Sequence, residues 1–288
     1  MEGTARRRRK LALAIPASLV DDSPHLRDKT IKVGIIGRAA AIFRVEEIII
    51  YRDKPRKDQR KAARFISQVL SYMETPQYLR KRLVKLKPNL RYVGVLPPLR
   101  TPNHPTQNRA EFLKKGEIRE GIVISTSPEG VEGDVGVERP VFVPKAAIEG
   151  NTRVTVKITD LGEPIKAILM KRKDVRVYWG YKIVNSGRSL EEIVKKRDFD
   201  LLIATSKYGR PILNVLPNLK KEIDSSRSIL LLFGSPSQGL YQIAEKEGWN
   251  LEEGVHYVLN TIPLQGTETV RTEEAVLCTL AILNPFIE

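Results

Sequence analysis

The chain has 288 residues, 41% of them hydrophobic, and a formal net charge of +15, which suits a soluble globular protein of one large or two smaller domains. No apolar run approaches the ~20 residues of a membrane span, and the single cysteine, Cys278, excludes a disulfide within the chain. We therefore expect a cytoplasmic, reducing compartment and no membrane. The three histidines are scattered, which excludes a Cys/His zinc site, and we expect no metal.

The excess positive charge is unevenly distributed. It lies almost entirely in residues 1–90, whereas residues 91–288 are nearly balanced. A local excess of this kind is typical of a protein that binds a polyanion, and it favours nucleic acid over a merely solvated surface. Residues 1–27, which include the basic run Arg6–Lys10, are expected to form a mobile basic arm.

The first third of the chain alternates between strand and helix patterns. The expected strands are Ile31–Ile36, Val45–Tyr51 and Arg91–Leu96. The expected helices are Gly37–Phe43, Gln59–Met73 and Gln77–Leu86. The last two carry basic faces that we expect to contact RNA phosphates, through Arg56, Lys57, Arg60, Lys61, Arg64, Arg80, Lys81 and Arg82.

Residues 105–171 change to short strands after a proline-rich boundary. The expected strands are Glu117–Ser125, Val131–Val137, Pro140–Val143, Arg153–Thr159 and Ile165–Met170. Five short strands in this length predict a small inserted barrel of the OB type, although an SH3-like barrel gives a similar pattern. Such a module can bind single-stranded or looped RNA, but it has few aromatic residues for base stacking, chiefly Phe112 and Phe142.

The α/β alternation then resumes. The expected strands are Val175–Ile183, Leu201–Ala204, Ser228–Phe233 and His256–Leu259. The expected helices are Ser189–Lys196, Leu219–Ile223, Leu240–Glu247 and an amphipathic last helix. We therefore predict an α/β domain, residues 28–104 and 172–288, with a mainly parallel sheet, interrupted by the barrel.

Three loops follow three of these strands: Thr205–Arg210, Gly234–Gly239 and Asn260–Thr269. Ligands of open α/β sheets bind beyond the carboxyl ends of the strands, so these loops are where a cofactor is expected. None is a Walker A or a G-x-G-x-x-G sequence. Taken singly, each also fits a tight strand-to-helix turn.

Two motifs add a family resemblance. Ile31–Asp53 resembles the opening motif R-x-A-x-x-F-G-V of ribose 2′-O-methylating enzymes, with Arg38, Ala40 and Phe43 matching and Arg44 at the usual glycine. The segment from Gly266 through Arg271 and Glu273 to Ala275 is similar to the G-x-x-x-L-R-x-E-T-A ending of rRNA uridine-N3 methyltransferases. The chain thus resembles the SPOUT superfamily of RNA methyltransferases, in the branch with an inserted OB-like domain.

The resemblance implies a C-terminal trefoil knot, S-adenosylmethionine as cofactor, and a homodimer whose active site is completed across the subunit interface. Backbone groups of the three loops would hold the cofactor. The positions carried over are Thr205, Gly234, Asn260, Ile262, Gly266, Thr267 and Val270.

The reaction needs a nucleophile placed in line with the methyl group. It also needs a group that helps remove the nucleophile's proton or stabilises the anion that results. Arg38 is the first candidate for stabilising the anion, and its alternative role is to bind an RNA phosphate. Arg271 and Glu273 either serve the substrate as catalytic residues or form a local ion pair that shapes the knot. Glu268 is a further candidate base.

The sequence therefore predicts an S-adenosylmethionine-dependent RNA methyltransferase acting on ribosomal RNA, at uridine N3 or a ribose 2′-OH. The closing motif matches at more positions than the opening motif and favours N3. The alternatives are a methyltransferase of tRNA and a non-catalytic RNA-binding protein that retains the fold.

Overall fold

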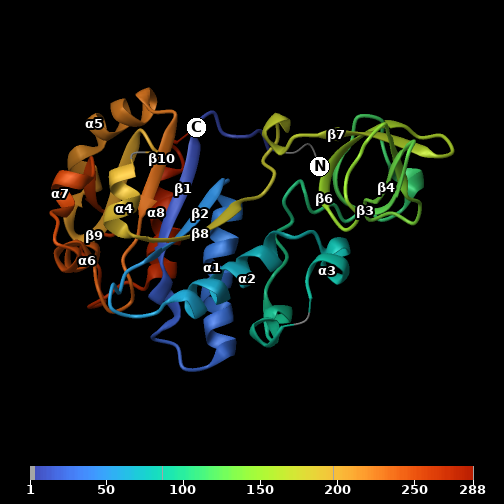
Figure 1. Cartoon of the computed structure of the whole chain (residues 1–288). Coiled ribbons are helices and arrows are strands. Elements are labelled where there is room, and N and C mark those ends of the chain that lie inside the picture. The colour runs from blue at the N-terminus through green and yellow to red at the C-terminus, as the bar shows by residue number, and fades with distance from the viewer. Residues whose placement is uncertain (1–3, 86, 197, 288) are drawn as a thin grey trace. The chain divides into compact units, whose positions relative to one another are not determined.

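The computed structural model describes residues 4–85, 87–196 and 198–287, and its chain divides into two compact units (Figure 1). The first, called the sheet unit, comprises Arg7–Ser71, Pro88–Pro97 and Tyr181–Glu288. The second, called the barrel unit, comprises Met1–Arg6, Tyr72–Lys87 and Pro98–Gly180.

The sheet unit is built on a six-stranded sheet with the order β11-β9-β10-β1-β2-β8, in which every pairing is parallel. Its strands are β1 (Lys10–Pro16), β2 (Glu47–Arg52), β8 (Lys182–Ser189), β9 (Leu201–Pro211), β10 (Ser228–Leu232) and β11 (Tyr257–Asn260). The predicted parallel α/β architecture is confirmed. Ligand-binding loops are therefore expected where these strands end.

Strand β1 corrects the expected arm over residues 1–27. Lys10–Pro16 pair with β10 on one side and with β2 on the other, at the middle of the sheet. Leu11–Ile15 are almost wholly inaccessible to solvent. A parallel strand buried on both faces has a continuous apolar sequence, and this was the missed signal. Residues 1–3 of the expected arm lie outside the described residues.

Helix α1 (Leu26–Ile42) replaces the strand expected at Ile31–Ile36. Val33, Ile36 and Ala40 recur at helical spacing and are buried, so the apolar run is one helix face rather than a strand. The strand expected at Arg91–Leu96 is also wrong, since short 3-10 turns occupy Pro88–Leu90 and Val93–Val95.

The turn after α1 explains how an arginine replaces the glycine usual in the opening motif. Arg44 has a φ of 53°, in the left-handed region where helices commonly end on glycine. Arg44 thus adopts a backbone conformation that favours glycine, the residue usual at this position of the motif.

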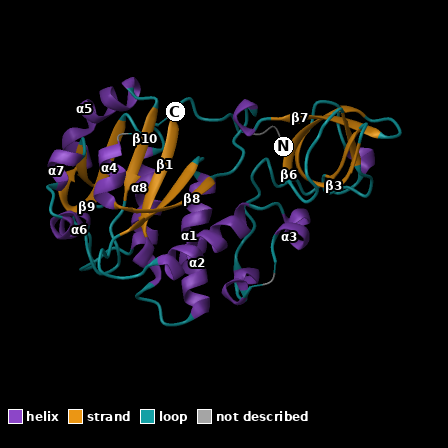
Figure 2. Ribbon diagram, viewed as in Figure 1, coloured by secondary structure: helices purple, strands orange, loops and turns teal. Residues whose placement is uncertain are grey.

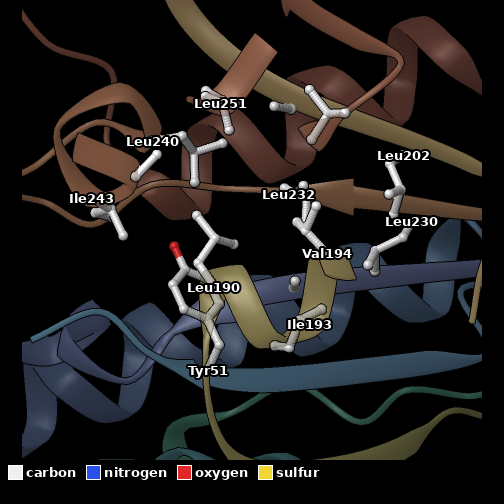
Figure 3. Close-up of a cluster of buried hydrophobic side chains, with 14 of the residues drawn as sticks. Tyr51, Leu190, Ile193, Val194, Leu202, Leu230, Leu232, Leu240, Ile243 and Leu251 are labelled. Carbon is white, nitrogen blue, oxygen red and sulfur yellow. The ribbon is translucent and has the colours of Figure 1, made fainter. Parts of the chain in front are cut away.

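Helices cover both faces of the sheet (Figure 2). Those of the sheet unit, besides α1, are α4 (Leu190–Lys196), α5 (Ile212–Ser225), α6 (Leu240–Glu247), α7 (Leu251–Gly254) and α8 (Thr272–Leu283), with most of α2 (Arg60–Glu74). One buried cluster joins α4, α6 and α7 to alternate strand residues, as Leu190, Ile243 and Leu232 illustrate (Figure 3). On the other side, α1 packs against α8.

Two further elements differ from the sequence prediction. The strand expected at Val175–Ile183 begins at Lys182, and the short helix expected at Leu219–Ile223 is the longer α5. Pro217 lies inside α5, where proline normally argues against a helix, and this concealed the helix's first turns.

The barrel unit contains a closed five-stranded barrel, as predicted, and its strand order is β3-β4-β5-β7-β6. Its strands are β3 (Ile118–Ser127), β4 (Gly130–Asp134), β5 (Val141–Pro144), β6 (Arg153–Asp160) and β7 (Ile165–Met170). Valine and isoleucine side chains from all five strands fill the interior. The unit also holds α3 (Gln77–Leu83), which ends before the predicted Leu86, a residue outside the described part of the chain.

A buried ionic network lies within the barrel unit. Arg153 Nη1 is 2.7 Å from Glu74 Oε2, and Arg153 Nε is 2.8 Å from Glu120 Oε2. Arg172 Nη2 adds a contact of 3.1 Å with Glu74 Oε1, and Trp179 Nε1 donates to Glu120 Oε1. Burial raises the pKa of Glu74, and the two arginines oppose that rise. The network ties the end of α2 to β3 and β6.

His104 makes the stability of this unit depend on pH. Its Nε2 lies 2.7 Å from the Glu74 carbonyl oxygen, and burial lowers its pKa from 6.5 to about 4. The unfolded chain therefore binds a proton between these values that the folded chain does not. Consequently the contribution of His104 to the unfolding free energy falls as the pH drops through this window, by roughly 3 kcal/mol in full.

We expect His104→Gln, which keeps a donor for the Glu74 carbonyl, to remove this part of the pH dependence. Urea unfolding of both proteins at about pH 7 and about pH 4.5 measures it. Equal losses of unfolding free energy in the two proteins would contradict the assignment.

Candidate active site

A cavity of about 320 Å³ lies at the ends of β10 and β11 and beside the second half of β9, where the expected loop Thr205–Arg210 is part of the strand. All three predicted loops contribute walls to it, together with the start of α8. The cavity size falls within the range of small-molecule sites. The sheet topology thus brings together loops that are separated by up to ~60 residues in sequence, as the strand-end rule predicts.

The first wall is an excursion from β9. Val258 and Leu259, which are consecutive in β11, pair with Ala204 and Arg210, so residues 205–209 leave the ladder. Thr205 Oγ1 anchors the excursion by donating to the Leu232 carbonyl at 3.0 Å. At its other end, a Cβ on Gly209 would lie 2.7 Å from the Val258 carbonyl oxygen. Only glycine fits there, which fixes the path of the loop.

The second wall, Gly234–Gly239, is a tight turn before α6. Ser235 N donates to the Gln238 carbonyl at 2.8 Å, and Gln238 N donates to Ser235 Oγ at 3.1 Å. A Cβ on Gly234 would lie 3.0 Å from the Gln238 carbonyl oxygen, so the first position favours glycine. The turn is thereby closed on itself and presents its backbone to the cavity.

The third wall, the loop after β11, is bonded to the other two. Asn260 Nδ2 donates to the Lys207 carbonyl at 3.0 Å, and Asn260 Oδ1 accepts from Ile262 N at the same distance. Thr272 Oγ1, at the start of α8, donates to the Gly234 carbonyl at 2.9 Å. These cross-links preorganise the three loops as one site.

One atom of the cavity wall lacks a partner. Gln238 Oε1 is buried and accepts no hydrogen bond from any described residue. Buried polar atoms are nearly always paired, and Gln238 lines the cavity, so a rotation of this side chain toward the cavity would let the oxygen accept from a ligand N–H or O–H. A cofactor with an amino group meets that requirement, and the sequence indicated the loop but not this residue.

The predicted cofactor residues divide into two groups. Gly266 and Thr267 are exposed and are not among the residues that line the cavity. The others line it: Thr205, Gly234, Asn260, Ile262 and Val270.

The predicted catalytic residues lie in different environments. Arg38 is half-buried on α1 and is not among the described residues that line the cavity. Arg271 is exposed, and its backbone N–H donates to Glu274 Oε2 at 2.9 Å, which caps α8. Glu268, the further candidate base, contributes its carbonyl to Lys207 Nζ at 3.1 Å. The site thus brings the loops together but leaves Arg38 outside the cavity of its own chain.

Glu273 is buried and pairs with a residue that sequence reasoning missed. Its Oε2 lies 3.5 Å from Lys32 Nζ of α1, and Lys32 also contacts Asp22 at 2.6 Å. Burial raises the pKa of Glu273, and Lys32 opposes that rise. Glu273 therefore joins α8 to α1. The local pair expected with Arg271 is not among the ion pairs of the described residues. The sequence did contain a signal for this pair, because Lys32 is a charged residue within an otherwise apolar helix face.

Seven of the eight predicted RNA-binding residues are exposed. Arg80 is the exception: its Nε donates to the Thr75 carbonyl at 3.0 Å and its guanidinium lies 4.3 Å from the centre of the Tyr72 ring. Arg60 and Arg82 each pair with a carboxylate, Asp58 and Asp134 respectively. The exposed ones are Arg56, Lys57, Arg60, Lys61, Arg64, Lys81 and Arg82.

None of the helices in the described part of the chain is long and apolar enough to cross a membrane. The described residues also contain no group of three or more His, Cys, Asp or Glu side chains arranged to hold a metal ion.

The chain is similar to known proteins over most of its length. A family model described as "Putative RNA methyltransferase" matches residues 10–283. The 28S rRNA (uridine-N(3))-methyltransferases of Homo sapiens and Drosophila melanogaster are each 33% identical, over 96% and 95% of this chain and 78% and 61% of their own. An uncharacterised protein of Haloarcula marismortui is also 33% identical, over 95% of this chain and 98% of its own. The chain therefore belongs to this family of RNA methyltransferases, enzymes that require a methyl donor.

Proposed function

We propose that the protein transfers a methyl group from S-adenosylmethionine to ribosomal RNA. The observation that carries the proposal is the cavity formed by the three cross-linked loops at the carboxyl edge of a parallel sheet, in a chain of this family. Its volume and the unpaired Gln238 Oε1 suit a small cofactor with an amino group. The trefoil knot expected in this region is part of the proposal.

S-adenosylmethionine supplies an electrophilic methyl group when it is bound. The loops would hold it through backbone groups and through Thr205, Asn260 and Gln238, whose positions are fixed by the cross-links described above. The remaining task is to place the RNA nucleophile in line and to stabilise the anion left by its proton. We assign the second task to Arg38.

The atom that receives the methyl group is proposed to be uridine N3. The human and Drosophila relatives are named for that modification, and the closing motif of this chain agrees with it. N3 of uridine loses its proton more readily than a ribose hydroxyl does. The proton can therefore pass to water, while a neighbouring guanidinium stabilises the anion that then takes the methyl group.

We further propose a homodimer. Ile31, Ile35 and Ile42 of α1 are exposed at helical spacing, and Leu277 of α8 is exposed as well. Since α1 packs on α8, we infer that these side chains share one apolar surface, which a second copy can cover. Arg38 follows Ile31 by seven positions and Ile35 by three, so it belongs to the same helix face. The dimer would present Arg38 to the cavity of the partner subunit.

Calorimetry with S-adenosylmethionine tests the cofactor assignment. We expect one molecule bound per chain, and Gln238→Ala is expected to weaken binding because it removes the unpaired acceptor. Absence of binding heat and of any thermal shift with the wild-type protein would favour the non-catalytic RNA-binding alternative.

The exposed lysines near the start of α2 are expected to contact RNA phosphates. Replacing Lys57 and Lys61 by alanine should weaken RNA binding and lower the slope of log affinity against log salt by about 1.4, with cofactor binding unchanged. Replacing Lys220 and Lys221 on α5, which are equally exposed, removes the same charge and serves as the control. Equal slopes for both double variants would contradict this assignment.

A further inference from the structure

The most exposed aromatic side chain of the described residues lies at the wall of the cavity. Tyr208 has 76% of its surface accessible, and it is also one of the residues that line the cavity. Exposed tyrosines are ordinary where the backbone is mobile, but here the loop that carries the ring is fixed at several points. An exposed aromatic ring on a fixed loop can stack against a ligand that contains a planar ring.

Four contacts hold the loop around Tyr208. Its backbone N–H donates to Ser206 Oγ at 3.2 Å, and the carbonyl of Lys207 accepts from Asn260 at 3.0 Å. Lys207 Nζ donates to the Glu268 carbonyl at 3.1 Å, which ties the loop to the third wall. Gly209 then abuts the β11 backbone so closely that no side chain fits. A ligand can therefore bind to the ring without first having to order a mobile loop.

The surroundings of the ring match a nucleotide. Lys207 Nζ lies 5.2 Å from the ring centre, and Arg210, where β9 pairs with β11 again, is exposed, so two cations are available for phosphates. Leu264, next to the cavity-lining Gln265, is fully exposed on the third wall. An aromatic ring, an aliphatic side chain and flanking cations at one cavity suit an unstacked base of RNA.

We propose that Tyr208 is a positioning residue that stacks on the target base once it has left the RNA helix, and so holds it beside the methyl donor. The inference rests on the proposed methyl transfer and adds the element that positions the base. An enzyme that modifies a base edge must first unstack that base, and a stacking surface at the cavity offsets part of the cost. The ring, and not its hydroxyl, performs this role.

Methyl transfer to ribosomal RNA by Tyr208→Ala, Tyr208→Phe and Tyr208→Trp tests the proposal. We expect kcat/KM for RNA to fall roughly 5- to 150-fold in Tyr208→Ala, with the Kd for S-adenosylmethionine unchanged. Tyr208→Phe and Tyr208→Trp should retain activity near the wild-type level. Leu213→Ala, an equally exposed apolar residue on α5, is the control and should show no loss.

Three outcomes would overturn the inference alone while the wild-type protein remains active. They are an unchanged kcat/KM in Tyr208→Ala, a loss in Tyr208→Phe as large as in Tyr208→Ala, and dissociation of the Tyr208→Ala dimer in sedimentation, which would make Tyr208 an interface residue. A wild-type protein that binds no S-adenosylmethionine and methylates no RNA would overturn the proposed function as well.

Discussion

Replacing Arg38 by alanine is expected to abolish methyl transfer while cofactor affinity stays intact. Arg38 is assigned to the anion of the target base and not to the cofactor, so its loss should leave cofactor binding intact. Loss of one preorganised donor to a developing anion typically lowers turnover about 100- to 1000-fold. Single-turnover methylation and calorimetry on the same preparation measure the two quantities. Unchanged turnover would remove Arg38 from the mechanism.

Mixing two inactive variants tests whether Arg38 acts across the dimer. Gly234→Val should block the cavity, because even a Cβ at this position lies 3.0 Å from the Gln238 carbonyl oxygen. If Arg38 serves the partner's cavity, each mixed dimer with Arg38→Ala has one complete site. Random exchange of subunits then restores about a quarter of wild-type activity. No recovery after verified exchange would place Arg38 in the site of its own chain, or outside any site.

Glu74→Ala is expected to cause the largest loss of stability. Glu74 is buried and accepts hydrogen bonds from Arg153 and Arg172, so its removal takes away the carboxylate that the two guanidinium groups share and leaves Arg153 paired with Glu120 alone. Breaking a buried ion pair from one side typically costs about 3–5 kcal/mol of unfolding free energy. Urea unfolding followed by circular dichroism measures the loss.

Two companion variants make the Glu74 result specific. Glu74→Gln keeps an acceptor for the arginines and should be less destabilised than Glu74→Ala. Lys195→Ala removes an exposed i,i+4 pair with Glu191 and should change the unfolding free energy by less than about 0.5 kcal/mol. A similarly small effect of Glu74→Ala would show that the network contributes little to the stability of the barrel unit.

The sequence predicted the architecture because most elements carry a local signal. The barrel strands are short and are separated by Gly, Pro and Asp turns, and α2 has a clear apolar face, so the local sequence was enough. The wrong predictions concern segments whose local sequence pattern fits one structure while their tertiary environment selects another. Leu11–Ile15 resemble any short apolar run until β2 and β10 lie on both sides, and the apolar face of α1 resembles a strand over six residues.

The candidate site was predictable as three loops but not as a set of contacts. The strand-end rule located the loops, whereas the cross-links through Asn260 and Thr272 depend on the folded register. The partner of Glu273 was not predictable either, because Lys32 lies more than two hundred residues earlier in the chain. Side chains that join distant elements carry no signature in local spacing.

Mass spectrometry of nucleosides from ribosomal RNA, incubated with the protein and S-adenosylmethionine carrying a labelled methyl group, tests the central claim most directly. The account predicts labelled 3-methyluridine that appears with the wild-type protein and is absent with Arg38→Ala. Labelled 2′-O-methyl nucleosides in its place would contradict the assignment to N3. Ribosomal RNA that acquires no labelled methyl group, with intact protein that binds the cofactor, would contradict the proposed substrate.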